Sequence, residues 1–264
     1  MISVLTTRSD PVADAALKQL IAPYGIELEF CPSSGVRLLQ LLQSRYFSAA
    51  LLRCEPSDLL LCSLPAQYRA RRQLQRSQLL PAQPDTLFFA LLPTVDATQR
   101  QSLQNAGYAA VLSMPISEYR LAEAIRQPLN RAQRLYHDQE DSLRAEYTQL
   151  LRDLGIPCHL KGFPFLCEAL VYLAANPDAL YQMTKVLYPH VAQCMDTSAG
   201  NVERNMRTAL DAMLTHGDPV KIAVHLPSIF SQARAQGGCR CKGRIGTSVL
   251  LAALSQSLQL RRNA

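Results

Sequence analysis

Short β-rich segments alternate with helical patterns through about the first 125 residues, and this alternation constrains the fold more than any other feature. The segment Thr86–Leu92 is apolar after its first residue, as a strand buried on both faces of a sheet should be. Asp10 followed by Pro11 is an expected helix start. We therefore predict an α/β fold with a doubly wound, five-stranded parallel sheet. The predicted strands are 2–6, 26–30, 47–52, 86–92 and 109–113, and the predicted helices are 10–22, 34–44, 97–105 and 117–126.

Residues 56–85 do not fit this alternation. They contain four prolines and the basic stretch Arg69-Ala-Arg71-Arg72. We interpret the stretch as the solvated face of a helix, and a contact with nucleic acid is the alternative interpretation.

A change in composition at Pro128 indicates a domain boundary. Residues 128–148 are polar and mixed in charge, which is typical of a linker, helical or not. Beyond this segment the chain has only helical patterns, interrupted at 155–157, 176–177, 189, 196–197 and 217–219. We predict an α/β domain at residues 1–127, a linker at 128–148 and an all-α domain at 149–264.

The positive charge of the chain is concentrated in its C-terminal half. The net charge is +6, and from residue 149 onward 12 Lys and Arg stand against 7 Asp and Glu. This excess favours a polyanionic partner, although similar excesses occur on ordinary protein surfaces. No apolar run reaches the ~18 residues that a membrane span needs, and the N-terminus lacks the features of a signal peptide. We therefore expect a cytoplasmic protein with no membrane partner.

The sequence predicts neither an enzyme nor a metal site. It has no phosphate-binding glycine loop and no pair of catalytic carboxylates, and none of its five histidines has a metal-binding spacing. The eight cysteines are scattered, mostly in apolar segments, so we expect reduced and buried thiols. Cys239-Arg-Cys241 is the one close pair. A zinc site needs about four ligands and no second pair matches, so we expect a loop without metal there.

The segment Tyr188–Met213 predicts a helix-turn-helix. Pro189 fits the first turn of a short helix, and Asp196-Thr197-Ser198 ends that helix and supplies cap oxygens for the next one. The second helix has its apolar residues on one face: Val202, Met206, Ala209, Leu210 and Met213. The opposite side, near the start of the helix, carries Asn201, Glu203, Arg204 and Arg207.

This layout is the one that reading the major groove of DNA requires, because a recognition helix buries one stripe and presents long polar side chains from its N-terminal half. An arginine can donate two parallel hydrogen bonds to guanine, and a glutamate can accept one from cytosine N4. An ordinary amphipathic helix with a solvated polar face has the same pattern. The pattern alone does not decide between the two interpretations.

Three segments of this half resemble the C-terminal effector domain of the stage zero sporulation protein A family. They are Leu154–Leu170 (LGIPCHLKGFPFLCEAL), Thr184–Pro189 (TKVLYP) and Val202–Arg207 (VERNMR), and they occur in the family's order. The similarity runs from about residue 150 to residue 217. After Asp218 the family's usual KPTNSEF stretch is replaced by Arg244–Leu250, which a Gly- and Cys-rich insertion at Gly237–Gly243 precedes.

The resemblance implies a six-helix domain that binds double-stranded DNA as a tandem homodimer in a sporulation-type transcription regulator, with RNA polymerase as a further partner. The family's recognition helix reads a short DNA box through a glutamate and two arginines, which fall on Glu203, Arg204 and Arg207. Asn201 and Asn205 differ from the family's usual arginine and alanine, so an identical box is not expected. Further candidates for DNA contacts are Asn201, Ser198, Lys161 and Lys185. His190 is expected to be exposed or a capping residue rather than a ligand.

The resemblance also implies that residues 1–127 are a phospho-receiver. Such a domain holds a divalent cation on an acidic pair after its first strand, accepts the phosphoryl group on an aspartate at the end of its third, and places a lysine after its fifth. These places hold Thr7–Asp10 with a single acid, Leu52–Pro56 without an aspartate, and Met114. We therefore predict a pseudo-receiver outside phosphorelay control, with no cofactor because the cation pocket is lost.

Arg8 and Arg53 would add positive charge to that pocket. Glu55 is a candidate mimic of a permanent negative charge, and Asp58 lies too far past the strand to be the acceptor. The leading hypothesis is a sequence-specific DNA-binding transcription regulator. The alternative is an interaction protein that pairs with or modulates a true response regulator and binds DNA weakly or not at all.

Overall fold

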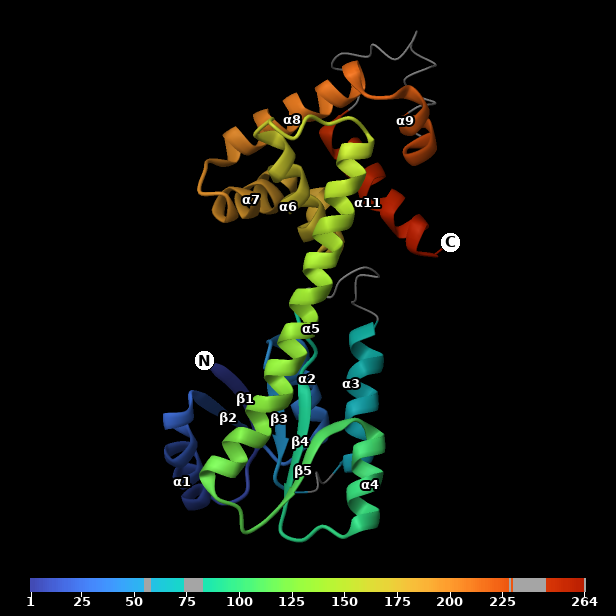
Figure 1. Cartoon of the computed structure of the whole chain (residues 1–264). Coiled ribbons are helices and arrows are strands. Elements are labelled where there is room, and N and C mark those ends of the chain that lie inside the picture. Colours follow the sequence, from blue (N-terminus) through green and yellow to red (C-terminus); the bar gives the residue numbers. More distant parts are fainter. Residues whose placement is uncertain (55–57, 74–82, 228, 230–245, 264) are drawn as a thin grey trace. The chain divides into compact units, whose positions relative to one another are not determined.

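The computed structural model describes residues 1–54, 58–73, 83–227, 229 and 246–263. The chain divides into two compact units, which separate within one helix between Tyr136 and His137 (Figure 1). The insertion at Gly237–Gly243, its Cys239–Cys241 pair and Glu55 lie outside the described residues.

The N-terminal unit is built on a five-stranded parallel sheet in the order β2-β1-β3-β4-β5 (Figure 1). This order is that of the flavodoxin-like doubly wound fold, in which the chain reverses direction across the sheet between β1 and β3. The predicted fold class is therefore confirmed. The strands are β1 Ile2–Thr7, β2 Ile26–Cys31, β3 Ala49–Leu52, β4 Leu87–Leu92 and β5 Tyr108–Ser113.

Side-chain caps fix the starts of three helices in this unit. The Asp10 carboxylate accepts from the backbone N–H of Ala13, as the sequence predicted, and Ser34 and Asp96 cap the next two helices in the same way. A left-handed Gly107, with φ of 107°, ends the last of these helices. The helices and 3₁₀ turns are α1 Pro11–Ile21, η1 Ala22–Tyr24, α2 Gly35–Ser44, η2 Leu61–Ser63, α3 Leu64–Gln73 and α4 Ala97–Ala106.

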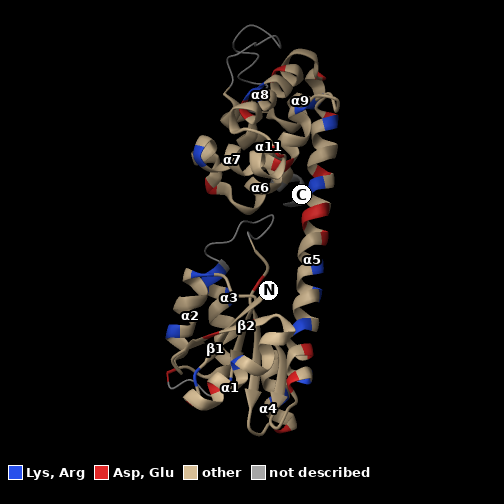
Figure 2. Cartoon of the chain, turned by 90° about the vertical axis from the view of Figure 1, so that its left-hand side faces the viewer, with Lys and Arg blue, Asp and Glu red and all other residues tan. Residues whose placement is uncertain are grey.

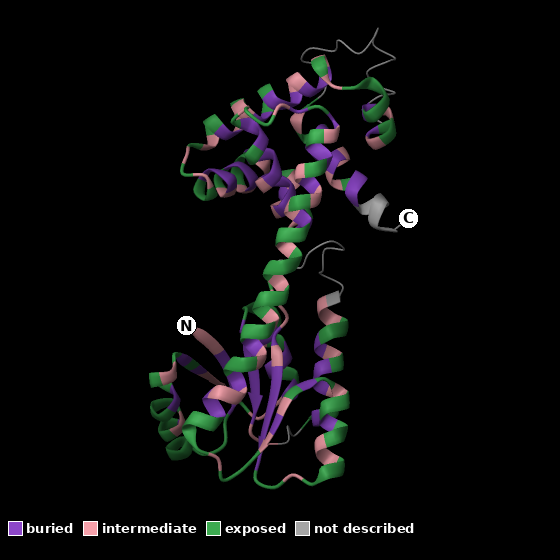
Figure 3. Ribbon diagram, in the orientation of Figure 1, coloured by how far each residue is buried: buried purple, intermediate pink, exposed green. Residues whose placement is uncertain are grey.

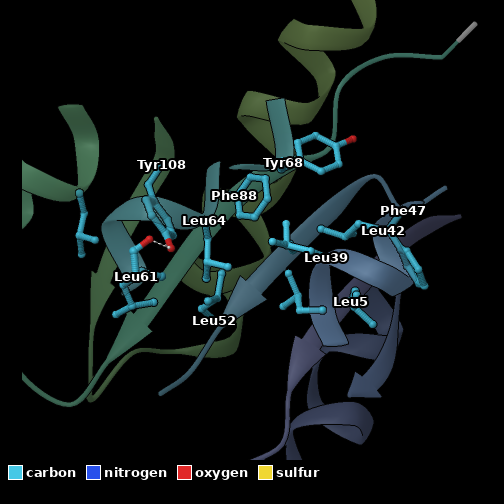
Figure 4. Packing of buried hydrophobic residues seen from close by; sticks show 14 of the residues in the cluster. Leu5, Leu39, Leu42, Phe47, Leu52, Leu61, Leu64, Tyr68, Phe88 and Tyr108 are labelled. Carbon is cyan, nitrogen blue, oxygen red and sulfur yellow. Dashed lines mark hydrogen bonds between the residues drawn. The ribbon is translucent and has the colours of Figure 1, made fainter. Parts of the chain in front are cut away.

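Alternate strand residues enter two apolar clusters, one on each face of the sheet. Leu5 and Leu52 belong to the cluster under α2, α3 and α4, whereas their neighbours Val4 and Leu51 belong to the cluster under α1 and the next helix, α5. Figure 4 shows the first cluster, where the hydroxyl of Tyr108 donates to the Leu61 carbonyl over 2.9 Å. A sheet covered on both faces explains the continuous apolar β4.

The basic stretch of residues 69–72 lies on α3, where Arg69 is exposed and Arg71 and Arg72 are partly exposed. Arg69 donates to the Ala106 carbonyl over 2.9 Å. Arg72 pairs with Asp85 at 3.3 Å and donates to the hydroxyl of Tyr68. These two guanidinium groups are bonded within their own unit.

The helix α5 runs without interruption over Glu118–Asp153 and contains Pro128, so the predicted end of this helix at residue 126 is wrong. Leu121, Ile125 and Leu129 are buried in one cluster at helical spacing on both sides of the proline. This packing outweighs the ~3 kcal/mol that an internal proline costs. The predicted linker is therefore helical, and its stretch 130–142 contains no buried residue (Figure 3). Both acidic and basic residues occur along this helix (Figure 2). The linker limits 128–148 remain a prediction.

The C-terminal unit is helical, as predicted. Helices α6 and α7 pack against α8, and α11 packs against α6 and α8. None of the described helices is long and apolar enough to cross a membrane. The elements are α6 Gly162–Ala175, the 3₁₀ segment η3 Pro177–Gln182, the π-helical turn η4 Met183–Leu187, α7 Tyr188–Cys194, α8 Ala199–His216, α9 Pro219–His225 and α11 Thr247–Asn263.

Candidate nucleic-acid interface

A tight turn connects α7 to α8, as the sequence predicted. The helix α7 ends at Cys194, and Asp196 adopts a left-handed conformation with φ of 46°, which a short polar side chain tolerates better than most. The Ser198 hydroxyl then accepts from the backbone N–H of Asn201 and starts α8. Residues 188–216 therefore form two packed helices around a four-residue turn.

The helix α8 has one buried and one exposed face (Figure 3). The buried face consists of Val202, Met206, Ala209, Leu210, Met213 and Leu214, and it includes all five apolar residues predicted for it. On the other side Asn201, Arg204 and Arg207 are exposed, and Glu203 is intermediate. The side chains predicted to contact DNA thus lie outside the core, on the N-terminal half of the helix.

Glu203 and Arg207 form an ion pair one helical turn apart, with 2.7 Å between Arg207 Nη2 and Glu203 Oε1. Their side chains are 40% and 61% exposed, respectively. An exposed pair with this spacing stabilises a helix by only about 0.3–0.5 kcal/mol. The ion pair therefore holds the Glu203 carboxylate and the Arg207 guanidinium side by side. A ligand that binds either group can break the pair at low cost in free energy.

Tyr188 lies close enough to this ion pair to interact with both of its charges, and the sequence analysis did not single it out. Its side chain is buried, and burial followed by the negative charge of Glu203 raises the pKa of the phenol. The available signal was its place in the first turn of α7, next to Pro189.

The other predicted contact residues are exposed as well. Ser198 caps α8 with its hydroxyl oxygen, and its O–H remains able to donate. Lys185 lies on η4, directly before α7, and Lys161 precedes α6. These three residues remain predicted contacts.

Gly162 brings the start of α6 against the backbone of α8, which the sequence analysis did not anticipate. A Cβ atom at this position would lie 2.1 Å from the carbonyl oxygen of Asn205, a separation that no real side chain accepts. The preceding Lys161 is thereby held beside the middle of α8. Glycine is required here because the two backbones approach closely, and not because of a left-handed φ.

The carboxyl edge of the sheet is the second place on which the sequence analysis made a prediction. It predicted that the acidic groups and the lysine of a phospho-receiver are missing there. The one acid of the loop after β1, Asp10, is used as the cap of α1. Met114 follows β5, where a receiver has its lysine. Its side chain is uncharged and 56% exposed. Asp58 accepts from the Ser34 hydroxyl and from the N–H groups of Gly35 and Val36, and these bonds hold the pKa of its carboxyl below the usual range. Asp58 is thus engaged in capping α2.

Arg53, at the end of β3, forms an ion pair with Asp14 of α1, and both side chains are only 11% exposed. The backbone N–H of Arg53 donates to the hydroxyl of Thr7, and Ser9 N–H donates to the Asp14 carboxylate. The sequence analysis singled out Arg53 but missed Asp14. A signal existed, because Asp14 is spaced three and seven residues from Leu17 and Ile21, on the face that α1 buries.

These residues do not fit a divalent cation. Mg²⁺ needs carboxylate oxygens that are free to coordinate it, and the carboxylates of Asp10 and Asp14 are committed to a helix cap and to a guanidinium. The guanidinium of Arg53 is itself a cation at the end of β3, so it repels a second one.

The cysteines are less buried than expected. Among the described ones, Cys31 and Cys167 are buried, whereas Cys62, Cys158 and Cys194 are exposed and Cys54 is intermediate, and all six are free thiols. Burial raises the pKa of the Cys31 thiol to about 11. The expectation of buried thiols is therefore wrong for the three exposed residues.

Comparison with known proteins gives a family match for part of the C-terminal half and a set of similar solved structures for about half of the chain. The family model "Sporulation initiation factor Spo0A C terminal" matches residues 147–236, which confirms the resemblance of this part of the chain. Solved structures similar to this chain include a CheY-like receiver domain protein from Methanospirillum hungatei (17% identity, 51% of this chain, 98% of that one, TM-score 0.41). A receiver domain of a sensor histidine kinase from Pseudomonas aeruginosa matches at 16% identity (49% and 98%, TM-score 0.40). A LuxR-family DNA-binding response regulator from Staphylococcus aureus matches at 14% (49% and 99%, TM-score 0.41).

Proposed function

We propose that this chain, whose residues 147–236 match the C-terminal domain of a sporulation initiation factor, is a sequence-specific DNA-binding transcription regulator in which α8 enters the major groove. The observation that carries the proposal is the exposed row of Glu203, Arg204 and Arg207 on a helix whose opposite face is buried. Arginine suits a guanine edge and glutamate a cytosine amine, so this trio can discriminate between bases.

Phosphate contacts would position the helix in the groove. Lys161, Lys185 and the hydroxyl of Ser198 are exposed around α8, and Asn201 lies in its first turn. Each neutralised phosphate releases counterions, so affinity should fall steeply with salt concentration. Binding as a homodimer on tandem boxes, contact with RNA polymerase, a cytoplasmic location and the absence of catalysis belong to the same proposal.

The N-terminal unit acts in this proposal as a pseudo-receiver, without aspartyl phosphorylation and without a bound cation. The buried Arg53–Asp14 pair and the exposed Met114 support this role, because neither provides the charge that phosphoryl transfer needs. Incubation of the full chain with acetyl phosphate and Mg²⁺ should leave its mass unchanged. Stoichiometric acyl phosphate on any residue of 1–127 would contradict it.

The test of DNA binding begins with selection of bound sequences from a random DNA pool. Arg204→Ala and Arg207→Ala should each weaken binding to the selected site by about 1–3 kcal/mol and relax base preference at one position, since each removes a bidentate contact. The matched control is Arg152→Ala, an exposed arginine on α5. If both α8 variants bind like the control, α8 is not the recognition helix.

A failure to select any sequence would favour the alternative, an interaction protein that modulates a true response regulator. The altered sequence at 237–243 favours this alternative, since it falls where the family's C-terminal helices support dimer contacts. A gel shift with the family's usual box separates the two functions.

A further inference from the structure

A cluster of three potential metal ligands lies between α6 and α7, away from the outward face of α8. Glu168 comes from α6, and His190 and Cys194 come from α7, where they are four residues apart and therefore share a face. One ligand atom from each residue lies within 4.8 Å of the other two. It is the one such group found among the described residues.

The separations between these atoms fit one small tetrahedral ion. Cys194 Sγ lies 3.6 Å from His190 Nε2, and the same nitrogen lies 3.6 Å from Glu168 Oε1. Bond lengths of about 2.3 Å for Zn–S and about 2.0 Å for Zn–N, at a tetrahedral angle, give an S···N separation of about 3.5 Å. The ligands would need little movement to bind a common ion.

The surroundings hold two of the ligands in place. The His190 ring stacks on Tyr172 with 3.8 Å between ring centroids, and its side chain is 31% exposed, so the histidine is partly rather than fully exposed. Arg144 donates to Glu168 Oε2 over 2.6 Å and leaves Oε1 facing His190. Residues that orient metal ligands in this way are usual in the second coordination sphere of zinc sites.

We propose that Glu168, His190 and Cys194 bind a single Zn²⁺ ion, with water as the fourth ligand. Thiolate, imidazole and carboxylate together are the ligand set of Zn²⁺, whereas Mg²⁺ and Ca²⁺ take oxygen ligands. The positive charge of Arg144 opposes the ion, but Glu140 pairs with Arg144 at 3.2 Å and offsets this charge. Cys194 is exposed, so the ion has an entry path, and the thiol proton leaves to solvent when the Zn–S bond forms.

The ion would link α6 to the last residue of α7, directly before the turn that leads to α8. It would bind the folded unit and not the unfolded chain, so it raises the melting temperature of this unit. The assignment does not depend on DNA binding, and its test uses metal binding alone.

The experiment uses the full chain carrying Cys239→Ser and Cys241→Ser, so that this second close cysteine pair cannot bind the ion. Zn²⁺ affinity is measured by competition with a chromogenic chelator, and Co²⁺ is used as a spectroscopic probe. We expect one equivalent of Zn²⁺ and, with Co²⁺, a tetrahedral spectrum with a thiolate charge-transfer band. Circular dichroism with EDTA verifies that each variant is folded.

Loss of a residue that only orients a ligand weakens metal binding about 10–100-fold, so loss of a ligand should cost at least about 100-fold. Cys194→Ser, His190→Phe and Glu168→Gln should each show this loss, and Cys194→Ser should also lack the charge-transfer band. Cys158→Ser, at an exposed cysteine outside the cluster, should bind like the parent. Unchanged Zn²⁺ affinity in folded Cys194→Ser, or a Co²⁺ complex without thiolate absorption in the parent, would overturn the proposal.

Discussion

The two units each contain an arginine–carboxylate pair, but in opposite environments. Arg53 and Asp14 are both 11% exposed, whereas Arg207 and Glu203 are 61% and 40% exposed. Breaking a buried pair by removing one partner costs about 3–5 kcal/mol, because the remaining charge is left without compensation. An exposed pair contributes a few tenths of a kcal/mol, and water replaces a lost partner.

The difference is that the charge of Arg53 is neutralised inside its unit, whereas the charge of Arg207 lies at the surface and is accessible to a ligand. Arg53 is satisfied within its own unit and has little accessible surface for a ligand. Arg207 uses one of its donors on Glu203 and keeps the others accessible. Exposure and partner, rather than residue type, therefore decide which arginines can act on a nucleic acid.

The largest effect should come from breaking the buried pair. Arg53→Ala leaves Asp14 charged and buried, so the N-terminal unit should lose about 3–5 kcal/mol of stability. Hydrogen exchange of the amides in β1 and β3 measures this loss without interference from the other unit. Arg207→Ala is the matched control, and an equal loss from both substitutions would remove the distinction between the two pairs.

The next largest effect concerns the packing of α6 against α8, the helix that carries the exposed Glu203–Arg207 pair. Gly162→Ala places a Cβ 2.1 Å from the Asn205 carbonyl, so α6 must move away from α8, at a cost of about 3 kcal/mol in the C-terminal unit. Hydrogen exchange in α6 and α8 reports the change. Gly200→Ala is the control, because a Cβ there meets nothing within 4 Å. Similar protection of the α6 and α8 amides from hydrogen exchange in the two variants would show that the packing of α6 does not stabilise α8.

A smaller effect should appear in DNA discrimination. Glu203→Ala removes a group that repels phosphates and can accept from cytosine, so binding to random DNA should strengthen while preference for the selected site falls by about 1–3 kcal/mol. Competition binding between specific and random duplexes measures both. Preserved preference would mean that Glu203 serves only to hold Arg207.

The smallest effect is the coupling between Glu203 and Arg207 in the free protein. A double-mutant cycle with alanine at both positions should give about 0.3–0.5 kcal/mol, reduced by salt. Thermal melting of the four proteins at low and high salt measures it. A coupling above about 2 kcal/mol would place the pair in the same class as Arg53–Asp14.

Local sequence signals predicted most of the fold. The five-stranded parallel sheet follows from alternating short strands and helices, and helix starts at Asp10 and Ser34 follow from side-chain caps, which involve neighbours in sequence. The main error was the helix predicted to end at residue 126, two residues before Pro128. The apolar spacing of Leu121, Ile125 and Leu129 continues across this proline, and tertiary packing decided the outcome.

The candidate interface was predictable because it depends on one helix, whose periodicity separates a buried from an exposed face. The contacts that the sequence did not predict join distant segments. Asp14 and Arg53 are 39 residues apart, and Glu168 meets His190 only because α6 packs on α7. The spacing of His190 and Cys194 was visible in the sequence, but the third ligand comes from another helix.

The Arg53–Asp14 pair also bears on how such a domain could change over evolutionary time. An acidic phosphorylation site at this edge of the sheet would require an acid near the end of β3 and the loss of the arginine there. Loss of Arg53 alone leaves Asp14 buried without its partner and costs about 3–5 kcal/mol, a large part of the roughly 5–15 kcal/mol by which native proteins are stable. Replacement of Arg53 therefore passes through a less stable protein unless Asp14 changes with it, and selection for a stable fold favours keeping the arginine.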